Sequence, residues 1–235
     1  LHPDCIEDRL REGPAFRPVV ERMRRSRFVP RVVGLLLVVV GVLVLGTVGG
    51  YWGYRTWAIS NLDRYDKEPG SAPVAPSLSL VALLQANADS SPPVWLRIPR
   101  IGVDSAVEEV GTEWKEAVYQ WVVPDYNVGH PREGIHPGQV GNSVVWGHMS
   151  TPVERKGSVF RRLPEVDAGD EVYVDTSRFR YVYRVSEVKV VTPEKVNVME
   201  ESREPILTLI TCVPDWVYSH RLVVTAQLVK VDPLG

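Results

Sequence analysis

The stretch RFRYVYRVSEVKVV, residues 178–191, alternates apolar and polar side chains along much of its length. Three large side chains, those of Tyr181, Tyr183 and Val185, fall on one face. A repeat of two residues is typical of a β-strand with one buried face. The stretch therefore predicts a long strand. The flanking sequence follows the same pattern, which predicts a domain built of strands.

Six further runs after residue 94 are short, rich in β-branched and aromatic residues, and separated by Gly, Pro, Asn and Asp. They are WLRIPRIGV (95–103), SAVEEV (105–110), SVVWGHM (143–149), EVYVDT (171–176), ILTLITC (206–212) and RLVVTAQLVKV (221–231). About seven or eight strands in a domain of this size indicate a closed barrel or a sandwich. We predict an all-β domain over residues 94–235, with one short helix at Ser158–Leu163.

A different pattern precedes this domain. Residues 32–54 contain no charged side chain, and a helix of this length, at about 1.5 Å per residue, crosses a hydrocarbon core of roughly 30 Å. Arginines cluster upstream and aromatic residues downstream, which predicts a transmembrane helix with a cytoplasmic N-terminus. One alternative is a cleaved signal peptide, whose apolar part is shorter. The other is a buried core helix, which the lack of a polar face and the glycines of the span, among them Gly34, Gly41, Gly46, Gly49 and Gly50, oppose.

The chain thus divides into four parts. We expect a cytoplasmic tail at 1–31, a transmembrane helix at 32–54, an extracytoplasmic stalk rich in Pro, Ser, Ala and Asp at 55–93, and the β domain at 94–235. The expected location is the cell membrane, with a single pass and the β domain outside. A net charge of −2 and a pI near 6.3 argue against a nucleic-acid binder.

The two cysteines lie on opposite sides of this predicted helix. Cys5 falls in the tail and Cys212 in the outer domain, so they cannot pair within one chain. Cys212 is either a buried core thiol or a nucleophile, and its place at the end of an apolar run, just before Val213, Pro214 and Asp215, leaves both open.

A thiol nucleophile needs a base or a cation beside it and a group that stabilises an oxyanion. His148 ends another apolar run and is the first candidate base. His130 and His136 lie in a Gly/Pro-rich segment, where a solvated surface position is expected. His220 adjoins Arg221 at the start of the last predicted strand.

Several of these segments resemble the sortase family. Residues 208–212, Thr-Leu-Ile-Thr-Cys, look like the family's cysteine signature, and GNSVVWGHM (141–149) looks like its histidine segment. Arg221 matches the arginine that opens the family's last strand. The segments WLRIPRIGVDSAVEEVG (95–111) and VFRRLPEVDAGDEVYV (159–174) are also similar to sortase segments. The resemblance covers roughly residues 94–231.

The resemblance implies a closed eight-stranded β-barrel with one or two short helices, behind an N-terminal transmembrane helix. It also implies a membrane-anchored cysteine transpeptidase that cleaves an LPXTG-like C-terminal sorting motif after its threonine. Cys212 would form a thioester with that threonine, His148 would protonate the leaving amine and deprotonate the incoming one, and Arg221 would hold the oxyanion. Thr211 would bind substrate through a hydrogen bond, or it is simply a β-branched strand residue.

The implied partners are secreted proteins with a sorting motif, an amine of the cell wall or a pilin lysine, and the membrane. No cofactor, metal or nucleic acid is expected. The Asp-Pro-Phe or Asp-Pro-Trp lid motif is absent from the sequence, which favours a housekeeping sortase over a pilin polymerase. Two other hypotheses remain open: an extracytoplasmic cysteine hydrolase of the same architecture, and a non-catalytic tethered β-barrel that binds a partner.

Overall fold

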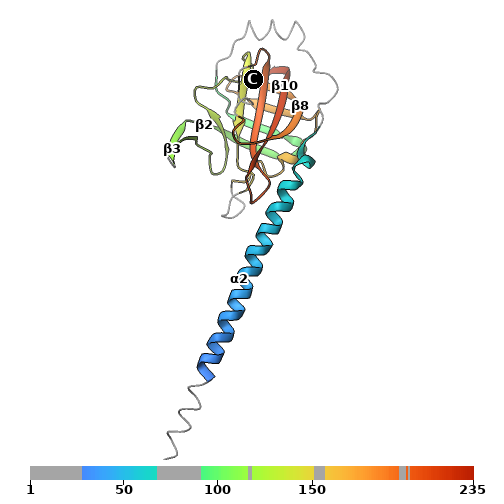
Figure 1. Cartoon of the computed structure of the whole chain (residues 1–235). Coiled ribbons are helices and arrows are strands. Elements are labelled where there is room, and N and C mark those ends of the chain that lie inside the picture. Colours follow the sequence, from blue (N-terminus) through green and yellow to red (C-terminus); the bar gives the residue numbers. More distant parts are fainter. Residues whose placement is uncertain (1–27, 68–90, 116–117, 151–156, 196–199, 201) are drawn as a thin grey trace, which may run out of the picture. The chain divides into compact units, whose positions relative to one another are not determined.

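The computed structural model describes residues 28–67, 91–115, 118–150, 157–195, 200 and 202–235 (Figure 1). It forms two compact units, residues 1–55 and 56–235. Helix α2 (Phe28–Ser60) contains the expected 32–54 span and extends beyond it at both ends. It is long and apolar enough to cross a membrane from Val32 to Ser60. The helix ends where the side chain of Asn61 donates to the carbonyl of Trp57 at 2.7 Å, which satisfies a terminal carbonyl.

The β domain is a closed eight-stranded barrel, which confirms the predicted fold class. Its strands are β1 (Trp95–Ile98), β2 (Val103–Val110), β5 (Val128–Pro131), β6 (Gly141–Trp146), β7 (Glu171–Asp175), β8 (Phe179–Val191), β9 (Pro205–Val213) and β10 (His220–Pro233). They close in the order β1-β2-β5-β6-β9-β10-β8-β7, and β8 lies beside β10 (Figure 1). The pairs β2–β5 and β6–β9 are parallel, and the other pairs are antiparallel.

Alternate side chains of these strands fill the barrel. Tyr181, Tyr183 and Val185 of β8 are all buried inside, as the alternation predicted. On β9, Leu207 and Leu209 face the same core. Burial of one such side chain contributes about 1.5–3 kcal/mol to folding stability. This gain keeps the apolar face of each strand in the core, and the side chains that alternate with it therefore point outward.

Three short 3₁₀ helices occur in the described residues: η1 (Leu62–Tyr65), η2 (Pro99–Ile101) and η3 (Leu163–Glu165). Strands β3 (Thr112–Lys115) and β4 (Val118–Trp121) form a separate two-stranded sheet. The helix expected at Ser158–Leu163 is instead a series of turns, in which Arg161 N donates to Ser158 O and Leu163 N donates to Phe160 O. Pro164 lies inside η3, where it has no N–H to continue an α-helical ladder.

The part of the expected 55–93 stalk that the structure describes begins against the barrel. Ala58 is fully buried, and Lys67 N donates to Val188 O of β8 at 2.9 Å. The carboxylate of Asp66 accepts the Val190 N–H at 2.6 Å. These bonds join the segment up to Lys67 to one barrel strand; residues 68–90 lie outside the described residues.

Candidate active site

Cys212 and Arg221 are directly opposite each other on neighbouring antiparallel strands, β9 and β10. Paired residues of this kind have Cβ atoms about 4.5–5.5 Å apart and project to one face of the sheet. Leu209 and Val213 of β9 point into the core, so the alternation places Cys212 on the outer face of the barrel. Both Cys212 and Arg221 are half-buried, and the guanidinium therefore lies beside the thiol at the protein surface.

His148 comes to the same end of the barrel through a parallel strand pair. In the register of β6 and β9, Trp146 lies opposite Ile210, and Gly147 N donates to Ile210 O at 3.2 Å. His148 and Cys212 each follow two residues after that pair. Because parallel strands end at the same edge, the two residues lie at adjacent strand ends, and both fall on the outward positions of their strands.

Thr211 faces the other way. Its side chain is 2% exposed, and its hydroxyl donates to the carbonyl of Gly147 at 2.9 Å. This bond joins the residue before Cys212 to the residue before His148. Substrate binding by Thr211 stays a prediction; the contact that the structure gives its hydroxyl is with the backbone beside the histidine.

Burial acts in opposite directions on the two titratable side chains. It raises the pKa of the Cys212 thiol, an effect that the charge of Arg221 partly opposes. Burial also lowers the pKa of His148, which the carboxylate of Asp125 partly opposes. At neutral pH the neutral thiol and the neutral imidazole are therefore the favoured forms, and the reactive thiolate with an imidazolium is a minor one.

The loops that follow the two strand ends are bonded to each other. Ser150, two residues after His148, donates to the carboxylate of Asp215, and its hydroxyl oxygen lies 2.6 Å from the hydroxyl of Tyr218. Because the serine proton goes to the carboxylate, Tyr218 is the donor to Ser150. Trp216 and Tyr218 hold positive φ angles of 63° and 54°, a strained conformation for residues other than glycine.

Sequence patterns did not indicate this network. Ser150 and Asp215 lie 65 residues apart in the chain, and each is an ordinary loop residue. Their proximity could be inferred only from the pairing of β6 with β9, since Ser150 lies two residues after His148 and Asp215 lies three residues after Cys212. The loop between β9 and β10 also positions the side chain of Arg221. Its Nη1 donates to the carbonyl of Tyr218 at 3.2 Å and to that of His220 at 3.1 Å.

The expectation that His130 is a solvated surface residue is wrong. His130 lies in β5 and is fully buried, and its Nδ1 lies 2.9 Å from the carbonyl oxygen of Val144. Because a carbonyl only accepts, Nδ1 carries the proton. Burial lowers the pKa of His130 to about 4. The Gly and Pro residues around β5 gave no strand pattern in the sequence. His220, in contrast, is half-buried, with its Nδ1 2.9 Å from the hydroxyl of Ser219.

The protein is a closed eight-stranded β-barrel whose neighbouring strand ends carry a cysteine, a histidine and an arginine. The model of the Sortase domain matches residues 96–229. The chain therefore belongs to the sortase family, a family of cysteine transpeptidases. Among the described residues, no group of three His, Cys, Asp or Glu side chains is placed to hold a metal ion.

Individual relatives match over part of their own length. Sortase A of Bacillus anthracis is 36% identical over 89 residues, 38% of this chain and 41% of the relative. Sortase SrtE1 of Streptomyces coelicolor is 25% identical over 147 residues, 59% of this chain and 40% of the relative. The matches therefore span well under two thirds of these relatives. Sortase C-3 of Streptococcus pneumoniae has a similar fold, with a TM-score of 0.50, 24% identity, and coverage of 63% of this chain and 68% of that one.

Proposed function

We propose that the chain is a membrane-anchored cysteine transpeptidase in which Cys212 is the nucleophile, His148 the proton carrier and Arg221 the oxyanion-binding group. The observation that carries this proposal is the direct pairing of Cys212 with Arg221 across β9 and β10, beside the strand end that bears His148. A nucleophilic thiol requires a positive charge or a base beside it, whereas a purely structural cysteine does not.

In the first step the Cys212 thiolate attacks the carbonyl carbon of a peptide bond, and an S–C bond forms. The carbonyl oxygen becomes an oxyanion, which the Arg221 guanidinium stabilises through fixed positive charge and paired N–H donors. As the tetrahedral intermediate collapses, the C–N bond breaks and the leaving nitrogen takes a proton from His148. The products are a thioester on Cys212 and a free amine.

In the second step a new amine attacks the thioester carbonyl and gives its proton to His148. A C–N bond forms, the C–S bond breaks, and the sulfur leaves as the thiolate. The thioester holds the acyl group between the two steps, so the first product departs before the acceptor arrives. Water competes with the amine for the same carbonyl.

We propose that the donor is a secreted protein with an LPXTG-like C-terminal sorting motif, cleaved after its threonine, and that the acceptor is an amine of the cell wall or a pilin lysine. Helix α2 supports a single-pass membrane anchor by its length and composition. Arginines upstream of it and aromatic residues downstream favour a cytoplasmic N-terminus with the barrel outside.

Incubation of the full chain in detergent with a library of sorting-motif peptides tests this proposal. Mass spectrometry of the intact protein is expected to detect an acyl adduct on Cys212, which the Cys212→Ala variant does not form. Cleaved peptide in the presence of triglycine is expected to appear as the ligated product. Hydrolysed product alone would indicate a hydrolase, and peptide binding by the wild-type chain without any adduct or cleavage would indicate a non-catalytic module.

A further inference from the structure

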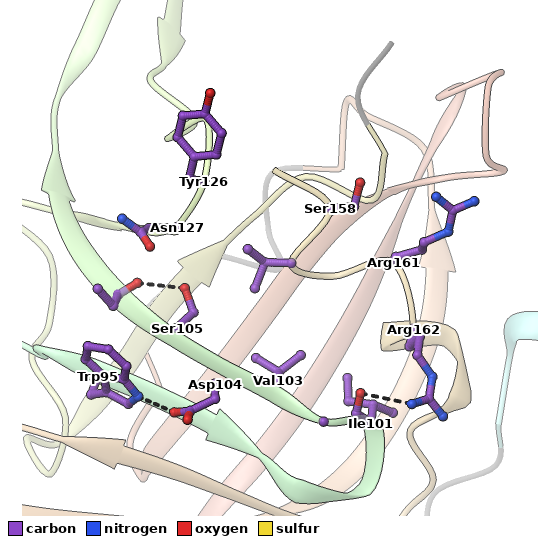
Figure 2. Close-up of a pocket in the computed structure, with 13 residues that line it drawn as sticks. Trp95, Ile101, Val103, Asp104, Ser105, Tyr126, Asn127, Ser158, Arg161 and Arg162 are labelled. Carbon is purple, nitrogen blue, oxygen red and sulfur yellow. Dashed lines mark hydrogen bonds between the residues drawn. The ribbon is translucent and has the colours of Figure 1, made fainter. Parts of the chain in front are cut away.

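A cavity of about 680 Å³ lies over strand β2, and Cys212 and Arg221 do not line it. Its floor includes Val103 and Ser105 (Figure 2). Tyr126 and Asn127 stand on one side of this floor, and the segment Ser158–Arg162 stands on the opposite side (Figure 2). The barrel mechanism described above assigns no role to this cavity.

A residue adjoining each wall of the cavity interacts with His148, which does not itself line the cavity. Phe160, whose neighbours Val159 and Arg161 line the cavity, donates its backbone N–H to the carbonyl of His148 at 3.0 Å. On the opposite wall, Asp125 directly precedes Tyr126, and its carboxylate is close enough to affect the pKa of the His148 imidazole. The cavity therefore lies on the histidine side of the proposed active site.

One wall also reaches the loop that follows Cys212. The guanidinium of Arg161 lies 3.9 Å from the carboxylate of Asp215, three residues beyond the nucleophile. Asp215 in turn accepts the hydrogen bond from Ser150, two residues after His148. Arg161 thus connects the lining of the cavity to the loop that follows Cys212.

We propose that this cavity binds the short peptide whose primary amine resolves the acyl-enzyme; the inference rests on the proposed transpeptidase function. The acyl group itself must lie across Cys212 and Arg221, on the β9–β10 side of the site. The acceptor amine must instead reach His148, because it gives its proton there. His148 does not itself line the cavity, but the backbone N–H of Phe160, between the lining residues Val159 and Arg161, donates to its carbonyl.

The cavity has the size and the polarity for such a ligand. Pockets of about 300–1,000 Å³ bind ligands of the size of a short peptide. The lining carries the carboxylate of Asp104, the hydroxyl of Ser105 and the amide of Asn127, which offer acceptors and donors to a peptide backbone. The lining also carries the guanidinium groups of Arg161 and Arg162, whereas the carboxylate of Asp104 is paired with Arg97 at 3.1 Å, so the lining favours the carboxylate end of a peptide acceptor such as triglycine.

The test uses the full chain in detergent and a donor peptide that acylates Cys212. Ser158→Trp fills the cavity from one wall, and Tyr126→Ala removes part of the other wall. Ser177→Trp, at an exposed serine in the turn between β7 and β8, is the matched control. The acyl-enzyme is resolved with triglycine, a peptide amine, or with hydroxylamine, which is too small to depend on a peptide-sized cavity.

We expect each cavity variant to lower the rate of transfer to triglycine at least tenfold and to increase the hydrolysed share of product. Acyl-enzyme formation and transfer to hydroxylamine should fall much less, and Ser177→Trp should keep the wild-type ratio of ligated to hydrolysed product. Equal loss of acylation and transfer, or an unchanged product ratio in both cavity variants, would overturn the inference. So would a wild-type enzyme that transfers to hydroxylamine but to no peptide amine. Failure to acylate at all would instead reject the proposed function.

Discussion

The hydroxyl of Thr211 donates to the carbonyl of Gly147 at 2.9 Å, and this bond joins the strand end of Cys212 to the strand end of His148. Both residues are buried, so the bond is shielded from water. It acts on the inner face of the barrel, whereas Cys212 lies on the outer face. The bond therefore positions the strand ends of Cys212 and His148 relative to each other, although it contacts neither side chain.

Thr211→Val should leave the Gly147 carbonyl without this donor inside the barrel. Loss of a buried hydrogen bond costs about 1–3 kcal/mol of folding free energy, and a misplaced strand end should lower kcat for acylation about tenfold with little change in KM. Thr211→Ser restores the donor and should recover most of kcat. Thr208→Val is the control, because Thr208 is buried in the same strand and donates to Asn142 at 2.7 Å, away from the site. Equal loss of kcat in both variants would indicate a general effect on stability.

Arg221→Lys keeps the charge opposite Cys212 but replaces paired donors by a single ammonium. We expect kcat to fall about 10²–10³-fold, the usual effect of removing an oxyanion donor, with a much smaller change in peptide binding. Steady-state kinetics with the donor peptide measure both. Arg184→Lys, on the exposed part of β8, should behave as wild type. A matching loss of kcat and of binding in Arg221→Lys would place the arginine in substrate binding instead.

The pH dependence of acylation should follow the opposite shifts of the two pKa values. The active form needs an ionised thiol and a protonated imidazole. Burial lowers the pKa of His148 and raises that of Cys212, so kcat/KM should rise through a limb below about 6.5, the ordinary imidazole value, and fall through a limb above the ordinary thiol value. A rate profile from pH 4.5 to 10 measures both limbs. An acid limb that lies above 6.5 would contradict the stated effect of burial on His148.

The buried His130 should make the barrel sensitive to acid. Its pKa is lowered from 6.5 to about 4 in the folded protein, so the unfolded chain binds the proton more tightly. The stabilisation is complete above pH 6.5 and is lost as the pH falls toward 4, an effect of about 3 kcal/mol. Urea unfolding in detergent at pH 7.5 and pH 4.5 should show a smaller difference for His130→Gln than for wild type.

The bonds of Ser150 to Asp215 and Tyr218 should act as one unit. Ser150→Ala and Asp215→Ala should each lower kcat about five- to tenfold, because either change removes the hydrogen bond that joins the two loops. The double variant should lose little more than either single one, since residues in one network are not additive. Ser186→Ala removes a serine of β8 that donates to Thr225 O of β10, and it should not change kcat. Additive losses in the double variant would show that the two side chains act separately.

Much of the fold was accessible from local patterns. The alternation of Tyr181, Tyr183 and Val185 indicated a strand and its buried face because the repeat of two residues is a property of the backbone. The charge-free span at 32–54 indicated the core of a long helix, although α2 continues to Ser60. Short segments with mixed signals were less accessible: β5 was hidden by Gly129 and Pro131, and its His130 was therefore assigned to the surface.

Local patterns in the sequence were sufficient to predict most of the barrel strands, the apolar helix and the three residue types that the chemistry requires, because each depends on neighbours within one segment. The parallel pairing of β6 with β9 and the position of Cys212 opposite Arg221 follow only from the folded barrel, because strand order and register depend on contacts between distant segments. The same contacts turned Thr211 toward Gly147, joined Ser150 to Asp215 and enclosed the cavity beside His148. These relationships exist only once the barrel closes, since no local preference of the chain specifies them.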